Sequence, residues 1–463
     1  MHTKTRILLA AVVATATTLP HSLRAQSADA LLDKLVQKGV LTLDEANDLK
    51  EQTDKDFTKA YAVKSGMSEW VNSLKFNGDF RGRFEGFYAD HPGFVDRARW
   101  RYRLRAGFTA SMLDDVEVGF RLGSGDIDGA NGISRGIDPI SNNQTFQNNG
   151  SKKGIFLDTA YAKWSPINAA DWTGTFTFGK MENPFTSSDL WFDHDYTPEG
   201  LAEQFSYTLT KEHTLKFTGA QFVLDEFGGS GKDPYFLGGQ ARLESVWTPK
   251  WSSTIGAGFH GILNEEQLTS AAVPDQNTGN SRDVIRSADG KSFTLGAPKA
   301  KFETFIVDAG LTYNLDSMPF HTGTFPVRVL GEYLYNFGAD TQNSGYQAGI
   351  SFGKAGKKKT WELTYRWKYL EGDAWYEELS DSDSGAYYSG PFAAATVPAA
   401  LRAAGSGYGA GTNVKGHWLR FGYSPLDSLT LNVTFISLDL IQEYAPGTSS
   451  NENRLQVDAI FKF

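Results

Sequence analysis

Arginine recurs at every second position of one segment of the chain, between Asp96 and Met112. The guanidinium groups belong to Arg97, Arg99, Arg101, Arg103 and Arg105. The positions between and beyond them, from Ala98 to Met112, carry apolar side chains. Side chains of a β-strand alternate between its two faces. The segment therefore predicts a strand with a column of cations on one face and an apolar band on the other. A guanidinium offers forked donors to carboxylate or phosphate, so this column could bind anions.

The same alternation places further arginines on the charged side of neighbouring segments. We predict a group of pore-lining cations, namely Arg81, Arg83, Arg97, Arg99, Arg101, Arg103, Arg105 and Arg121. On the predicted strands whose faces can be assigned, inward basic residues outnumber acidic ones, although the formal net charge of the chain is −9. Fixed cations concentrate anions in a narrow aqueous pore, so we predict a weak preference for anions. The alternative is that these arginines pair with Asp79, Glu85 and Glu117 and only line a solvated wall.

An acidic segment follows one of the predicted strands, between residues 182 and 200. Its carboxylates form a candidate constriction loop, namely Asp189, Asp193, Asp195 and Glu199. Folded into a pore, they would face the arginines. The alternative is an ordinary external loop, because the direction of a loop cannot be read from sequence. The triplet Asp193, His194 and Asp195 could also bind a metal, but scattered loop carboxylates are commoner, and we predict no metal site.

Motifs for catalysis lack the context that their chemistry needs. Residues 349–353 match the nucleophile-elbow pattern but lie within a predicted strand with no helix after it. Residues 256–261 match a dinucleotide-binding glycine pattern without a surrounding βαβ unit. The chain has no cysteine, which excludes thiol catalysis, disulfides and thiolate zinc sites. We predict no enzyme and no cofactor. An outer-membrane hydrolase with a wall serine and histidine ranks lowest, since the histidines show no suitable pairing.

The elements that position these residues are strands. Two-residue periodicity predicts sixteen of them, at 74–88, 96–112, 115–125, 154–165, 173–181, 201–209, 213–224, 235–247, 252–263, 301–315, 325–338, 345–353, 360–371, 414–424, 428–440 and 453–463. Their connections are alternately short and long, as in bacterial barrels with short periplasmic turns and long external loops. Outward faces are apolar, and aromatic residues gather near the short turns. We predict an all-β, 16-stranded antiparallel transmembrane β-barrel over residues 73–463. The faces of 154–165 cannot be assigned.

The N-terminal part differs from the rest. Residues 1–25 have a basic start, an apolar run and a small-residue end, which predicts a secretory signal peptide. Residues 26–72 carry helical spacing and a capping box at Thr42 and Glu45, which predicts a short periplasmic helical hairpin or coiled coil. This segment could trimerise, plug the pore or contact the cell wall, or it could have no binding role.

Three stretches resemble known families. The last strand ends on Leu455, Val457, Ala459, Phe461 and the C-terminal Phe463, and it resembles the terminal strand of bacterial outer-membrane proteins. Residues 35–42 and 179–185, with the acidic positions that follow, resemble the bacterial outer-membrane putative porin family, related to the phosphate-selective porins. The resemblance implies a sixteen-stranded, trimeric diffusion channel.

These observations predict an outer-membrane porin for the passive diffusion of small hydrophilic solutes, with a weak preference for anions. The alternative is an outer-membrane structural or adhesion protein whose barrel is plugged. Expected partners are small hydrophilic or anionic solutes, outer-membrane lipid and two further copies in a homotrimer. The negative net charge argues against nucleic acid.

Overall fold

The computed structural model describes residues 68–90, 94–125, 140–269, 278–286, 293–389, 406–442 and 450–463. The chain divides into two compact units, Met1–Asn72 and Ser73–Phe463. The predicted signal peptide and nearly all of the predicted helical segment 26–72 lie outside the described residues. Within the described part, no helix is long and apolar enough to cross a membrane.

Sixteen antiparallel strands of the described chain form one closed ring. In order around the ring they are β1 (Val71–Tyr88), β2 (Arg97–Met112), β3 (Val116–Gly125), β5 (Gly154–Asn168), β6 (Trp172–Lys180), β7 (Glu199–Thr208), β8 (His213–Val223), β9 (Tyr235–Val246), β10 (Trp251–Leu263), β13 (Glu303–Leu315), β14 (Phe325–Asn336), β15 (Ser344–Gly353), β16 (Thr360–Leu370), β19 (Val414–Leu426), β20 (Leu429–Leu440) and β21 (Ser450–Lys462). Each predicted strand coincides with one of them, so the predicted barrel is confirmed.

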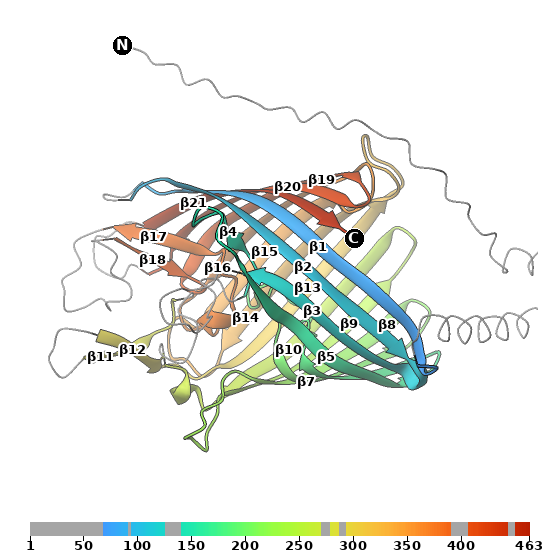
Figure 1. Ribbon diagram of the computed structural model, residues 1–463, viewed down its shortest axis with the longest axis horizontal. Coiled ribbons are helices and arrows are strands. Elements are labelled where there is room, and N and C mark those ends of the chain that lie inside the picture. The colour runs from blue at the N-terminus through green and yellow to red at the C-terminus, as the bar shows by residue number, and fades with distance from the viewer. Residues whose placement is uncertain are drawn as a thin grey trace, which may run out of the picture. The chain divides into compact units, whose positions relative to one another are not determined.

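The ring closes where its first and last strands meet. β1 pairs with β21 from Asp79 opposite Lys462 to Tyr88 opposite Asn453. β1, in blue, lies beside β2 and close to the C-terminus in Figure 1. Because this pairing leaves no free edge, the backbone groups of the wall are satisfied between strands, as a hydrocarbon environment requires.

The alternation of side chains fixes which face of each strand points into the ring. On β2, Arg101 and Arg103 are buried, whereas Trp100 and Leu104 on the opposite face are exposed. On β1, Arg81 and Arg83 are buried and Phe80 is exposed. The arginines therefore face the lumen and the apolar band faces outward.

One strand breaks the alternation. In β5 the register against β3 shifts after Arg121, which lies opposite Thr159, so that Leu122 lies opposite Leu157. Asp158 and Thr159 are consecutive and both buried, as expected at a β-bulge. This bulge explains why two-residue periodicity could not assign the faces of 154–165.

The long connections carry short elements of their own. They are β4 (Gln144–Thr145), β11 (Arg282–Arg286), β12 (Phe293–Pro298), β17 (Gly385–Ser389) and β18 (Ser406–Ala410), with 3-10 turns at Glu265–Gln267 and Glu377–Leu379. A further 3-10 turn, Leu113–Asp115, forms the short connection between β2 and β3. β4 of the β3–β5 connection pairs with β2, and β17 of the β16–β19 connection pairs with β21, so each of these two connections lies against a strand other than those that it joins.

Candidate functional site

Two loops enter the ring. We call residues 181–198 the first inner loop and residues 371–384 the second inner loop. In the first, the Asp189 carbonyl oxygen accepts a hydrogen bond from Lys368 of β16 at 2.7 Å. Further along the same loop, the Asp195 carboxylate accepts one from Arg103 of β2 at 2.7 Å. Since four strands, β1, β21, β20 and β19, separate β2 from β16 on the shorter way round the ring, the loop crosses the lumen between them.

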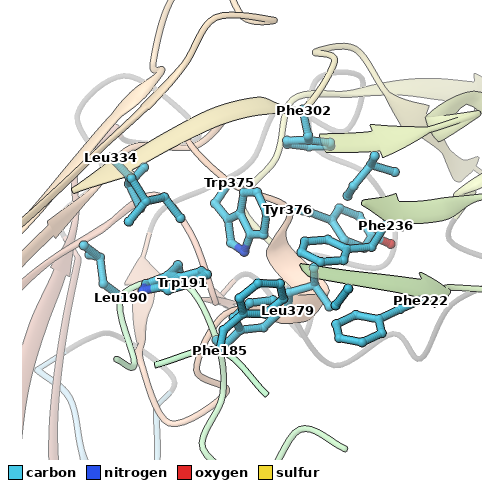
Figure 2. Packing of buried hydrophobic residues seen from close by; sticks show 14 of the residues in the cluster. Phe185, Leu190, Trp191, Phe222, Phe236, Phe302, Leu334, Trp375, Tyr376 and Leu379 are labelled. Carbon is cyan, nitrogen blue, oxygen red and sulfur yellow. The ribbon is translucent and has the colours of Figure 1, made fainter. Parts of the chain in front are cut away.

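An apolar cluster holds both inner loops against the wall. From the first loop come Phe185, Leu190, Trp191 and Phe192, and from the second come Ala374, Trp375, Tyr376 and Leu379. They pack on inward residues of β8, β9, β10, β13, β14 and β16, among them Phe222, Phe236, Ile262, Ile306, Leu334 and Leu370. Figure 2 shows Trp375 between residues of the first loop and of the barrel wall. This lumen cluster buries large side chains on one side of the ring, where the wall is apolar inward.

A histidine lies inside the lumen cluster. His260 of β10 is fully buried, and its ring packs against Phe185 and Trp191, each with centroids 4.9 Å away. Neither of its ring nitrogens has a hydrogen-bond partner among the described residues. It therefore contributes to the packing of the first inner loop rather than to the polar part of the lumen.

A polar cavity of about 230 Å³ lies on the other side of the lumen. Its lining comes from β1, β2, β16, β19, β20, β21, both inner loops and the segment before β4. The charged lining residues are Arg81, Arg83, Arg103, Arg366, Arg420, Asp189, Asp193, Asp195, Asp381, Asp383 and Asp458. Trp418 also lines it, with the Arg366 guanidinium 3.8 Å from its ring centroid. The cavity is thus bounded by arginines of the wall and aspartates that lie mostly on the loops.

Most charges of this cavity are paired. Arg83 bonds Asp458 at 2.7 Å across the β1–β21 pair. Arg366 pairs with Asp189 of the first inner loop. Loop carboxylates such as Asp189, which a count of strand positions leaves out, therefore offset part of the excess of inward cations.

Arg81 differs from these arginines. Its Nη2 donates to Asn143 Oδ1 at 2.6 Å, and it forms no ion pair with any described carboxylate. Its side chain is only 7% exposed, and its Nε has no hydrogen-bond partner among the described residues. A nearly buried guanidinium thus borders the cavity with its charge uncompensated by direct contact.

The loop carboxylates differ in proton affinity. Burial, together with Asp381 and Asp195, raises the pKa of Asp193 well above its ordinary value. Burial would also raise the pKa of Asp195, but Arg103 and other nearby arginines outweigh it, and the pKa is lowered. At Asp383 the pKa falls to about 2, since Arg454 and Arg83 outweigh the effect of burial. Opposite shifts on neighbouring carboxylates follow from whether a cation is within reach.

The predicted pore-lining arginines separate into two groups. Arg81, Arg83 and Arg103 border the cavity. The other five do not border it. Arg99 and Arg101 lie 2.5 and 3.8 Å from Glu85, and Arg105 pairs with Asp79 at 2.7 Å. Arg121 pairs with Asp158 and Glu182, and Arg97 is exposed at the start of β2. One expected acidic partner differs, because Glu117 accepts a hydrogen bond from Tyr161 at 2.9 Å.

Three of the four predicted loop carboxylates, Asp189, Asp193 and Asp195, border the cavity. The placement of Glu199 was wrong. The β6–β7 ladder continues to this residue, which lies opposite Lys180 and pairs with it at 3.3 Å. Its side chain is 66% exposed. Because Glu199 is already part of a strand, it cannot take part in a loop that crosses the lumen.

Sequence reasoning missed the second inner loop, which it placed within a long external connection. Asp381, Ser382 and Asp383 of this loop border the cavity. A signal was present: Ala374, Trp375 and Tyr376 form an apolar and aromatic run inside a polar loop, and such a run favours burial. Among the residues with a described position, no cluster of three or more histidines, aspartates or glutamates could hold a metal ion.

Comparisons with known proteins give a family match and similar solved structures. Residues 93–286 match the family model described as "Putative porin". Similar solved structures include Pseudomonas putida OprB at high pH, with 11% identity, 89% of this chain and 97% of that chain covered and a TM-score of 0.49. Another is the outer-membrane channel DcaP of Acinetobacter baumannii, with 13% identity, 84% of this chain and 97% of that chain covered and a TM-score of 0.41. Among curated proteins, none matches. The family match and the closed ring place this protein in the bacterial outer membrane.

Proposed function

We propose that this outer-membrane protein is a porin through which small hydrophilic solutes diffuse passively. The observation that carries the proposal is the division of the lumen. The lumen cluster fills one side of the ring with apolar side chains, whereas a polar cavity borders the other side. A solute that keeps its hydration favours the polar side, because apolar groups cannot replace water as hydrogen-bond partners. The inner loops would set the size limit, and no chemical step is involved.

We further propose a weak preference for anions. Arginines of β1 and β2 form one wall of the cavity, and one of them, Arg81, has no direct ion pair with a described carboxylate. Charged rings along a pore bias which ions enter. The bias would be small, because Arg83, Arg103 and Arg366 are each paired with an aspartate.

Planar lipid bilayers test both parts. Purified protein should produce stepwise current increments in KCl, and the reversal potential in a KCl gradient should shift toward that of chloride. Absence of any increments would contradict the porin proposal. A shift toward the potassium potential would contradict the anion preference and leave the porin proposal intact.

A structural or adhesion protein with a plugged barrel is the second candidate. The lumen cluster favours it, because large buried residues of both inner loops occupy the ring. Under this proposal the protein would insert into bilayers without conducting, and its long external loops would bind a partner. Conductance measurements separate the two candidates directly.

The expected assembly is a homotrimer, and the expected role of residues 26–72 is contact with the cell wall. The resemblance described above supports the homotrimer and the relation to phosphate-selective porins, whereas contact with the cell wall is one of the roles that helical spacing leaves open for residues 26–72. Native mass measurement of the full chain in detergent tests the first, and co-sedimentation with peptidoglycan tests the second.

A further inference from the structure

We propose that Arg81 is the contact for one oxyanion group, a carboxylate or phosphate, of a solute passing through the polar cavity. This inference rests on the proposed porin function and assigns the anion contact to one residue. The other arginines of the cavity are assigned a structural role.

The neighbouring guanidiniums are already engaged. Arg83 bonds both carboxylate oxygens of Asp458, at 2.7 and 3.0 Å. Arg103 lies 2.7 Å from Asp195 and 3.2 Å from Asp79. An anion that approached either of them would have to displace a carboxylate that the fold holds in place.

Arg81 is held without being neutralised. Its partner Asn143 is itself fixed, because Asn143 Nδ2 donates to Ser141 Oγ at 2.6 Å. The amide oxygen orients the guanidinium but carries no net charge. Both Asn143 and Ser141 line the cavity beside Arg81. The result is an oriented cation with spare N–H donors at the edge of a polar space.

The energetics favour an incoming anion at this position. A cation that is nearly buried without a counter-ion has lost much of its hydration and has gained no ion pair in exchange. A carboxylate or phosphate group would supply that ion pair. A guanidinium also matches such a group better than a spherical ion, because its N–H groups can bond two oxygens at once.

The nearby carboxylates do not oppose this binding strongly. Asp195 and Asp458 are the carboxylates that act most strongly on the charge of Arg81. Each of them is paired with another arginine, Asp458 with Arg83 and Asp195 with Arg103. An anion at Arg81 would therefore meet two neutralised pairs rather than two free negative charges.

The experiment compares three variants of the full chain in planar bilayers. R81Q removes the charge, and R81K keeps the charge but removes the fork. K216Q is the matched control: Lys216 of β8 carries the same charge, points inward, pairs with Glu244 at 2.8 Å and does not line the cavity. Each protein is measured in a KCl gradient and then in symmetric KCl with added acetate or inorganic phosphate.

We expect acetate and phosphate to reduce the chloride current of the unmodified protein and of K216Q, and to have little effect on R81Q. The permeability ratio of chloride to potassium should fall about twofold in R81Q. R81K should keep that ratio and lose most of the sensitivity to oxyanions. Equal ratios and equal sensitivity in R81Q and the unmodified protein would overturn the assignment, as would an equal loss in K216Q.

Failure of the variants to fold is separable from failure of the proposal. Folded barrels are identified by their β-sheet circular dichroism and by current increments of any size. If R81Q does not fold, R81K tests the proposal by itself. Lysine keeps the charge but lacks the paired N–H donors of the guanidinium, so a loss of oxyanion sensitivity in R81K would support the assignment. If the unmodified protein shows no increments, the porin function itself is contradicted.

Discussion

The Asp193 carboxylate of the first inner loop accepts two hydrogen bonds from Ser382 of the second, one from the backbone N–H and one from the hydroxyl, each at 3.1 Å. In the other direction, the Leu379 carbonyl accepts the backbone N–H of Asp193 at 2.8 Å. These contacts join two loops that are almost two hundred residues apart in the chain. The position of each loop in the lumen therefore depends on the other.

This contact should be sensitive to pH. The pKa of Asp193 is raised by burial and by the nearby Asp381 and Asp195, so the folded loops bind a proton that an unfolded chain releases near pH 4. The stability that this proton contributes is complete below that pH and is lost as pH rises through the raised pKa. We expect more frequent current fluctuations as pH is raised from 4 to 8, measured on single channels.

The variant D193N isolates the effect. Its amide oxygen can still accept from Ser382, but it does not ionise, so the fluctuations should become independent of pH. If the frequency of fluctuations rises equally with pH in D193N and in the unmodified protein, another group is responsible for the pH dependence.

Trp375 should anchor the second inner loop. It is fully buried, and its ring lies 6.1 to 6.2 Å from those of Phe192 and Phe236. W375A would leave a large void in the lumen cluster, which typically costs about 3–5 kcal/mol. We expect a lower denaturation midpoint in urea and a larger single-channel conductance. F320A is the control, since Phe320 is 91% exposed and its loss should change neither. Unchanged conductance in W375A would contradict the anchoring role.

Glu85 should be essential for closing the ring. This fully buried carboxylate of β1 accepts from Arg99 of β2 at 2.5 Å and from Arg454 Nε of β21 at 2.9 Å. E85Q would leave several guanidiniums without their shared counter-ion, which typically costs about 3–5 kcal/mol. The free energy of unfolding in lipid measures the effect. E244Q breaks a partly exposed pair and should cost under about 1 kcal/mol. Equal effects would show that burial of Glu85 is unimportant.

Glu203 should destabilise the outer wall. Ala202 and Gln204 face the lumen, so Glu203 points outward, where its carboxylate lies over Gly219. It has no hydrogen-bond or ion-pair partner among the described residues. It lies midway along β7, and a charge on the lipid face near mid-membrane costs up to about 2 kcal/mol for a carboxylate. E203L should therefore raise the free energy of unfolding in lipid.

The opposite result for E203L would also be informative. If the variant were less stable, or lost an oligomer seen by native mass measurement, then a neighbouring protein would cover this face. E212Q is a suitable control, because Glu212 lies in a short turn outside the ring.

The strand pattern could be predicted because the wall has different solvents on its two sides. Every inward position of β2 except Gly107 is polar and each outward one is apolar or aromatic, so period two is visible without any tertiary information. At Asp158 and Thr159 the extra residue of the bulge interrupts this period, and local sequence has no way to show which residue is inserted.

The candidate site was less predictable than the wall. Asp189, Asp193 and Asp195 could be identified by type, but whether their loop turns inward depends on Trp191 and Phe192 meeting an apolar patch of the lumen. That patch is assembled from six different strands, so it exists only after folding. The second inner loop was missed for the same reason, and Glu199 was misplaced because strand ends are not marked by a change in composition.

The ion pair between Arg83 and Asp458 joins the first and last strands at the border of the polar cavity. The route proposed for solutes therefore runs along the seam where the two ends of the barrel meet. A nascent chain that lacked β21 would be missing part of the lining of that route as well as the strand that closes the barrel. Assembly and permeability are thus coupled, because the pairing of β1 with β21 closes the barrel and completes the lining of the cavity in one step.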